Sequence, residues 1–189
     1  TRPVAVLTGA RQTGKTSTLR RLFPDHGFVS LDLPTEAEQA EKEPDAFLRR
    51  HPPPSIIDEV QYAPALFRHL KAAVDAHRGR NGQYLLTGSQ KFTLMKGVSE
   101  SLAGRADIVE LETLSLAEIR RALPATSLEA AVVRGGFPEL HANPEIDAPA
   151  FHNSYLATYL ERDVRSLANV DRLRDFARFL RACALRSAH

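Results

Sequence analysis

The chain has very little cysteine. Cys183 is the only one among 189 residues, so an internal disulfide is excluded. Free thiols without disulfides are typical of a reducing compartment, and we therefore expect a cytoplasmic protein. No apolar run approaches the roughly 20 residues of a membrane-spanning helix, and no signal peptide is recognisable. We expect no membrane partner.

The chain also carries little net charge. A formal charge of +2 is too small to indicate a nucleic-acid partner. From Phe151 onward, however, seven arginines stand against four acidic residues, which leaves DNA open as a partner. The seven histidines show no ligand spacing with one another or with Cys183, so no zinc site is predicted.

Length and composition indicate a globular protein. Hydrophobic residues make up 43% and charged residues 25% of the chain, as in ordinary folded domains. One α/β domain and part of a second element fit into this length. The sequence begins on an apolar run and stops inside a helical pattern, so we expect it to be part of a longer protein.

A glycine-bounded loop follows the first apolar run, residues 4–7. Residues 9–16 read GARQTGKT and satisfy the pattern GxxxxGK[ST] in full. Gly9 and Gly14 allow successive backbone N–H groups to point at a phosphate, and the helix expected over 17–23 adds its positive end. Lys15 can reach the β- and γ-phosphates, and the Thr16 hydroxyl can bind Mg²⁺. The Arg11 side chain is expected to face solvent or a partner. The predicted nucleotide-binding residues of this loop are Gly9, Ala10, Arg11, Gln12, Thr13, Gly14, Lys15, Thr16 and Ser17.

Four further apolar runs, separated by helical segments, follow the loop. We expect strands over 28–32, 55–59, 84–87 and 108–111. Helices are expected from Pro34 to the break at Pro44, from there to about Arg50, from Ala65 to about His77, and through Ser101. This alternation predicts an α/β fold, a three-layer αβα sandwich around a five-stranded parallel sheet.

Beyond Thr113 the pattern becomes helical. Helices are expected from Leu114, from Ser127 to Gly135, over 150–167 and from Asp171, with a loop through Asn143. We therefore divide the chain into a core, 1–113, and a helical region, 114–189.

Asp58 and Glu59 end the third strand, 42 residues after Thr16. A carboxylate at this place is expected to hold Mg²⁺ through water opposite Thr16. Glu59 can orient the water that attacks the γ-phosphate or accept its proton. This favours hydrolysis over phosphoryl transfer to a small molecule.

Polar residues near two other strands are further candidates. Thr87 or Ser89, at the end of the fourth strand, could sense the γ-phosphate or fix the water; the sequence does not choose between them. Arg105, before the fifth strand, could neutralise charge developing on phosphate in its own subunit or in a neighbour's site.

Six segments carry a family resemblance: GARQTGKT, IIDEVQ, LLTGSQ, SLAGR, GGFPE and YLATYLERDV. Because it has these segments in this order, the chain resembles uncharacterised prokaryotic AAA+-type P-loop ATPases with a C-terminal domain of unknown function. The resemblance implies sheet order 5-1-4-3-2. It also implies Walker A roles for Lys15 and Thr16, Walker B roles for Asp58 and Glu59, and a sensor at Ser89 or Thr87. The segment from Leu114 would be a small helical lid leading into a truncated C-terminal domain.

The expected function is a Mg²⁺-dependent ATPase that passes a conformational change to its C-terminal part. Lys15, Glu59 and Arg105 are the predicted catalytic residues. A nucleotide-gated switch with little turnover and, less favoured, a small-molecule kinase are the alternatives. ATP is preferred to GTP because no guanine-specificity motif is present. A protein partner, DNA and a homo-oligomer stay open.

Overall fold

The computed structural model describes residues 2–89, 91–159 and 173–186. It divides into two compact units, Thr1–Ser115 and Leu116–His189. No helix in the described ranges is both long enough and apolar enough to cross a membrane.

Five parallel strands form the centre of the first unit. They are β1 (Val4–Thr8), β2 (Gly27–Ser30), β3 (Ser55–Asp58), β4 (Tyr84–Gly88) and β5 (Ala106–Glu110). The hydrogen-bonded order β2-β3-β4-β1-β5, read from the β5 edge, is 5-1-4-3-2. Both the α/β class and the order implied by the resemblance are confirmed.

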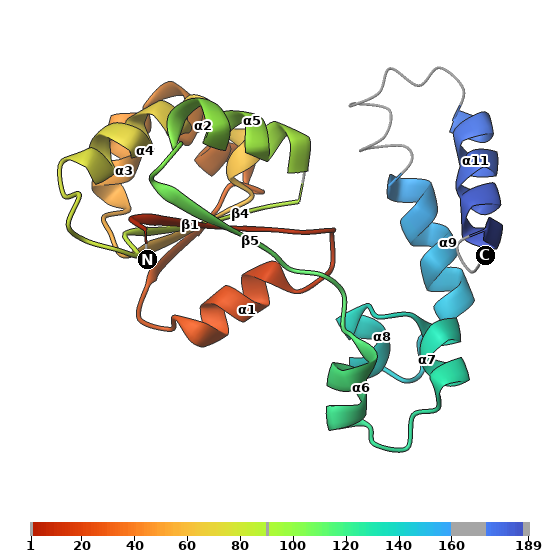
Figure 1. Cartoon of the computed structure of the whole chain (residues 1–189). Helices are drawn as coiled ribbons and strands as arrows, with labels where there is room; N and C mark the ends of the chain where they lie inside the picture. The colour runs from red at the N-terminus through yellow and green to blue at the C-terminus, as the bar shows by residue number, and fades with distance from the viewer. Residues whose placement is uncertain (1, 90, 160–172, 187–189) are drawn as a thin grey trace. The chain divides into compact units, whose positions relative to one another are not determined.

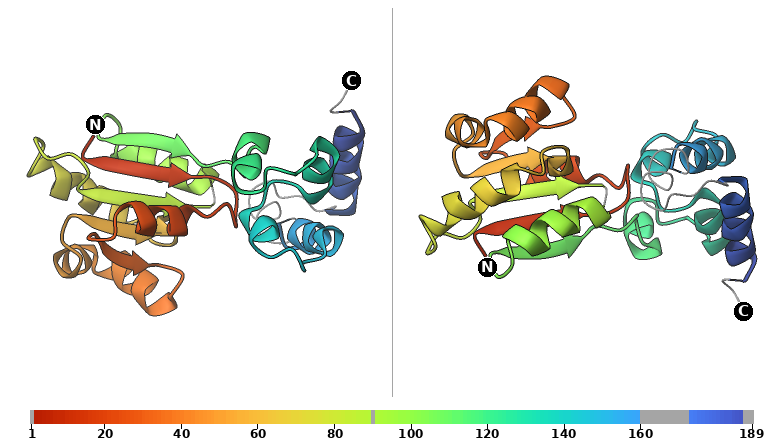
Figure 2. Two further views of the ribbon diagram at one scale, coloured as in Figure 1. Left: turned by 90° about the horizontal axis from the view of Figure 1, so that it is seen from below. Right: turned by 90° about the horizontal axis from the view of Figure 1, so that it is seen from above.

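Helices cover both faces of this sheet (Figures 1 and 2). The helix α1 (Lys15–Leu22) lies on one face, and α4 (Leu66–Asp75) and α5 (Lys91–Ser101) lie on the other. Beside β2 are α2 (Pro34–Lys42) and α3 (Pro44–Arg50), and the short 3₁₀ turn η1 (Val60–Tyr62) follows β3. The expected three-layer sandwich is therefore present.

Alternating strand residues divide the core between the two faces. Leu7, Ile56 and Leu85 pack with Leu19 of α1 in a small cluster. Their neighbours along the strands enter a larger cluster with the buried sides of α4 and α5; its strand members include Val6, Ile57 and Leu86. Two buried faces explain why β3 and β4 are almost continuously apolar.

The second unit is helical in its described residues. It contains α6 (Leu116–Ala122), α7 (Leu128–Arg134), α8 (Pro138–Ala142), α9 (Ala148–Tyr159) and α11 (Leu173–Arg186). The short α8 stands where the sequence predicted a loop, because Pro138 occupies the first turn of a helix that ends before Pro144. The C-terminal part of the helix predicted over 150–167 and the start of the helix predicted from Asp171 lie outside the described residues.

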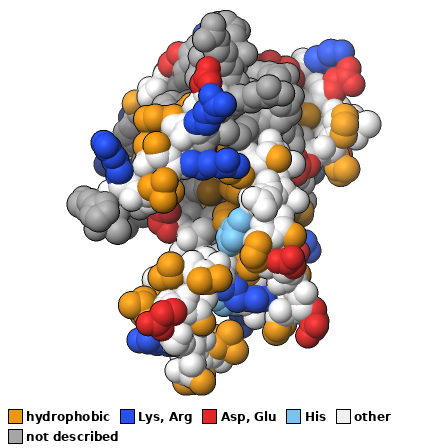
Figure 3. All heavy atoms as spheres, turned by 90° about the vertical axis from the view of Figure 1, so that its right-hand side faces the viewer, with side chains coloured by type: hydrophobic (Ala, Val, Ile, Leu, Met, Phe, Trp, Pro, Cys, Tyr) orange, Lys and Arg blue, Asp and Glu red, His pale blue; other side chains and the backbone are white. Residues whose placement is uncertain are grey.

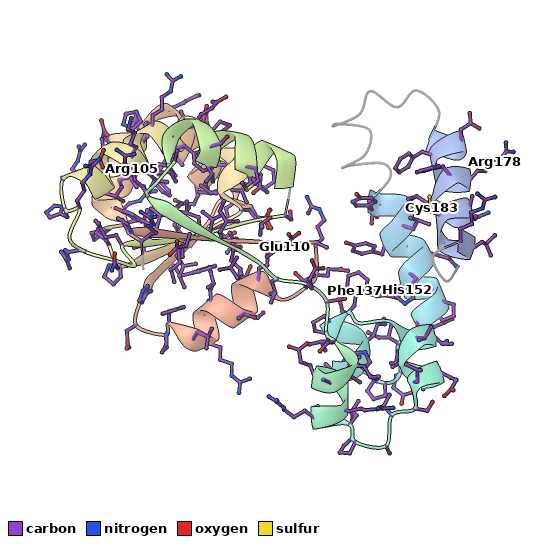
Figure 4. The ribbon with its side chains drawn as sticks, in the orientation of Figure 1. Arg105, Glu110, Phe137, His152, Arg178 and Cys183 are labelled. Carbon is purple, nitrogen blue, oxygen red and sulfur yellow. The ribbon has the colours of Figure 1, made fainter. Side chains whose placement is uncertain are left out.

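An aromatic group holds part of this second unit together. The Phe137 ring lies 4.7 Å from Tyr155 and 5.4 Å from Phe151, between ring centroids. It also lies beside His152, as Figure 4 shows. The His152 ring nitrogen Nε2 is 3.0 Å from the carbonyl oxygen of Arg134. These contacts connect α9 to the turn between α7 and α8.

Close packing of α4 against α5 gives a stability prediction. A Cβ atom added to Gly97 would lie 2.6 Å from two ring carbons of the buried Phe67. We expect Gly97→Val to lower the free energy of unfolding by about 2 kcal/mol through overpacking, measured by urea denaturation. The control is Gly79→Val, where nothing lies within 4 Å of the added Cβ; it should change stability by no more than about 0.5 kcal/mol. Equal stability of the two variants would contradict this packing.

Candidate functional site

The candidate site lies at the edge of the sheet where the parallel strands end. β1 enters the glycine-rich loop at this edge, β3 delivers Asp58 and Glu59, and β4 delivers Thr87 and Ser89. Since β4 pairs with both β1 and β3, its end lies between the loop and the two carboxylates. Carboxyl ends of strands are the usual ligand sites of open α/β sheets.

The loop takes a conformation that requires its glycines. Gly9 has φ 145° and Gly14 has φ 89°, and Gln12 between them also has a positive φ, 61°. A side chain at Gly9 would overlap the carbonyl oxygen of Leu111. The helix α1 begins directly after Gly14, so its free N–H groups face the loop. This arrangement is suited to an anion.

Lys15 is folded back into the loop. Its Nζ donates to the carbonyl oxygens of Gly9, at 3.0 Å, and Ala10, at 2.6 Å. The residue is 5% exposed, and burial lowers the pKa of Lys15 below its usual value, opposed by the charges of Glu59 and Asp58. The ammonium group therefore lies in a poorly hydrated place, where an added anion would be attracted strongly.

Asp58 collects hydroxyl groups from three segments of the chain. Oδ1 accepts hydrogen bonds from Thr16, at 2.6 Å, and Thr87, at 2.5 Å. Oδ2 accepts one from Ser30 at the end of β2, at 3.2 Å. The carboxylate thus joins the first turn of α1 to the ends of β2 and β4.

Glu59 is held separately from Asp58. Its backbone is left-handed, with φ 55° and ψ 45°, and its N–H donates to the Thr87 hydroxyl at 3.1 Å. The side-chain oxygen Oε2 accepts hydrogen bonds from the Ser89 hydroxyl, at 2.9 Å, and from Nε2 of Gln61. Adjacent carboxylates are thereby turned to different partners.

The donor set fits a magnesium ion. Thr16 and Asp58 offer hard oxygen ligands that already touch each other, and Mg²⁺ is commonly held by one or two such groups with substrate phosphates and water. Among the described residues, no group of three or more His, Cys, Asp or Glu could hold a metal. Phosphate oxygens would have to complete the coordination.

The structure gives Thr87 and Ser89 different contacts. Thr87 is fully buried and bonds to Asp58 and to the backbone of Glu59, whereas Ser89 bonds to the Glu59 side chain. Sequence reasoning treated the two as alternatives, and it missed Ser30 and Gln61. Ser30 ends the strand beside β3, a position that strand order could have indicated. Gln61 is the last residue of the IIDEVQ segment, where its side-chain direction depends on the turn after Glu59.

The structure separates Arg105 from this group. Arg105 precedes β5, and its carbonyl oxygen accepts from the N–H of Val4, at the start of β1 (Figure 4). Its guanidinium donates two 2.8 Å hydrogen bonds to Asp75 at the end of α4. The starts of β1 and β5, and this ion pair with them, lie at the edge of the sheet opposite the loop, so the structure does not bring Arg105 to the loop of its own subunit. Action in a neighbour's site stays a prediction.

The remaining predicted residues lie within the loop or directly after it. Thr13 is buried and donates to the Ala10 carbonyl oxygen at 2.9 Å. Arg11 is half-buried and lies near enough to Lys15 to lower its pKa, while Ser17 is exposed on α1.

The second unit shows mixed surface chemistry where it is described. Basic, acidic and hydrophobic side chains are interspersed on the face drawn in Figure 3. The DNA partner considered from the sequence stays a prediction.

Comparison with known proteins agrees with this architecture. A solved Walker-type ATPase of Pyrococcus abyssi, PABY2304, has a similar fold, with a TM-score of 0.51 and 17% identity over 92% of this chain and 72% of that chain. Uncharacterised proteins of Mycobacterium bovis and Mycobacterium tuberculosis, Mb2031c and Rv2008c, are each 34% identical over 174 residues. That match covers 87% of this chain and 37% of each relative.

Two family models divide the chain between them. Residues 125–189 match a domain of unknown function, DUF8612. Residues 1–120, which contain the loop, Asp58, Glu59 and all five strands, match the AAA domain. The chain therefore belongs to the AAA domain family.

Proposed function

We propose that this chain binds ATP with Mg²⁺ and hydrolyses it. The observation that carries the proposal is the group of hydrogen bonds from Thr16 and Thr87 to Asp58, with Glu59 bonded beside it. These bonds join the glycine-rich loop to a carboxylate pair across two strands. A P-loop ATPase requires this combination of groups.

Binding would use the loop and its lysine. The N–H groups around Gly14 and the start of α1 are suited to the β-phosphate, and Lys15 would exchange its two carbonyl partners for phosphate oxygens. Thr16 and Asp58 would hold Mg²⁺, directly or through water. When bound, the ion neutralises charge on the β- and γ-phosphates.

In hydrolysis, Glu59 would orient and deprotonate the attacking water molecule. Ser89 and the backbone contact with Thr87 fix the carboxylate at the end of β3, beside the loop. A carboxylate there can orient water for in-line attack and accept its proton. The adjacent Asp58 is occupied by three hydroxyls and is therefore less suited to act as the base.

Contacts of Gly9 support a proposed route for coupling to the C-terminal part. A Cβ atom added to Gly9 would lie 2.2 Å from the carbonyl oxygen of Leu111, so this close approach is open only to glycine. The Leu111 N–H donates to the carbonyl oxygen of Thr8 at 2.8 Å. Residues 111–115 lead from β5 into the helical unit. A movement of the loop on nucleotide binding would therefore displace the segment that enters that unit. We propose this segment as the route of the conformational change.

The lysine supplies a test of binding. We expect Lys15→Ala to weaken ATP binding by about 10- to 100-fold, because charged hydrogen bonds contribute about 1.5–3 kcal/mol; a fluorescent ATP analogue measures this. The control is Lys42→Ala, an exposed lysine paired with Glu38 on α2, which should leave affinity unchanged. Equal affinities of both variants would contradict the proposed site.

Glu59 supplies a test of turnover. We expect Glu59→Gln to bind ATP within about twofold of the unchanged protein and to lose about 10²- to 10⁴-fold in kcat, the usual contribution of a general base. Phosphate release at saturating ATP is the measurement, with the exposed Glu100→Gln as control. ATP binding without turnover in the unchanged full-length protein would instead favour a nucleotide-gated switch.

A further inference from the structure

Gln61 is a buried polar residue to which the sequence analysis gave no role. It lies in η1, immediately after the left-handed turn at Glu59, and is 4% exposed. The turn is closed by the Tyr62 N–H, which donates to the Glu59 carbonyl oxygen at 3.1 Å. This turn directs the Gln61 side chain back toward the carboxylate that precedes it.

The Gln61 amide is oriented by that carboxylate. Nε2 donates to Oε2 of Glu59, and the opposite orientation would place Oε1 against a carboxylate that can only accept. The Oε1 atom is then buried, and it has no hydrogen-bond partner among the residues that the structure describes. A Cβ atom on Gly88 would lie 2.5 Å from this Oε1, so the glycine at the end of β4 makes room for the amide.

An amide with one buried, unpaired end is a poor way to stabilise a fold. Buried polar atoms are nearly always paired, and an unpaired one lowers stability. Gln83, directly before β4, shows the usual arrangement: it is 4% exposed and its Nε2 donates to the carbonyl oxygens of His77 and Arg80. The environment of Gln61 therefore points to a role at Glu59.

The two donors to Glu59 converge on one oxygen. Ser89 and Gln61 both bond to Oε2, and no described residue donates to Oε1. The second oxygen is thereby left to accept from water.

We propose that Gln61 is a positioning residue for ATP hydrolysis, which holds Glu59 so that its Oε1 faces the attacking water. This inference rests on the proposed function. It assigns Gln61 no contact with the nucleotide, so its loss should change kcat and leave ATP affinity unchanged.

The test compares Gln61→Leu with Gln83→Leu in the full-length protein. We expect Gln61→Leu to lower kcat by about tenfold or more, with ATP affinity within about twofold and an unfolding midpoint no lower than that of the unchanged protein. Gln83→Leu should show the reverse: a lower midpoint, because two carbonyls lose their donor, and an unchanged kcat. A Gln61→Leu protein with kcat within twofold of the unchanged protein would overturn the proposal.

A double variant shows whether Gln61 acts through Glu59. Residues that act as one unit are not additive, so Glu59→Gln combined with Gln61→Leu should be no slower than Glu59→Gln alone. A further loss in the double variant, similar to that of Gln61→Leu alone, would overturn the proposal.

A readout without turnover separates this inference from the proposed function. In nucleotide-free protein, the side-chain amide signal of Gln61 in a ¹H–¹⁵N spectrum should move on Glu59→Ala, while that of Gln83 should not. A Gln61 signal that does not move would overturn the inference even in an active ATPase. An unchanged protein that releases no phosphate would overturn the proposed function, although the Gln61–Glu59 bond could still be present.

Discussion

The carboxylate of Asp58 is the interaction on which the site depends. It accepts hydrogen bonds from the hydroxyls of Thr16, Thr87 and Ser30. These lie in the first turn of α1 and at the ends of β4 and β2, the two strands that flank β3. Such convergence requires parallel strands that end at one edge, and the buried apolar runs of β1, β3 and β4 supply them. The fold therefore sets the relative places of the loop and the carboxylates before any nucleotide is bound.

Sequence reasoning predicted correctly those features that a short stretch of sequence determines. The GxxxxGK[ST] pattern identified the loop that the structure shows, and apolar runs located all five strands. Strand order came from the family resemblance, since alternating strands and helices do not fix the order in which strands pair. The segment after Phe137 was harder, because a helix of only five residues that starts at Pro138 and ends before Pro144 resembles a loop.

Contacts between residues distant in the sequence are the part that sequence reasoning did not find. Arg105 was chosen by residue type, but its place at the start of β5 and its ion pair with Asp75, 30 residues away, depend on the packing of α4. The hydrogen bonds from the Arg105 guanidinium lower the pKa of the Asp75 carboxyl to about 2. Ser30 and Gln61 were missed because their roles follow from strand adjacency and from a left-handed backbone at Glu59, which sequence spacing does not reveal.

The central claim is that one magnesium site lies between Thr16 and Asp58. A crystal of the protein with a non-hydrolysable ATP analogue and Mn²⁺ in place of Mg²⁺ tests it most directly, because manganese gives an anomalous signal. The account predicts a single strong peak beside the Thr16 hydroxyl, on the side facing Asp58, with phosphates over the loop. A peak elsewhere, or phosphates bound away from Lys15, would contradict it.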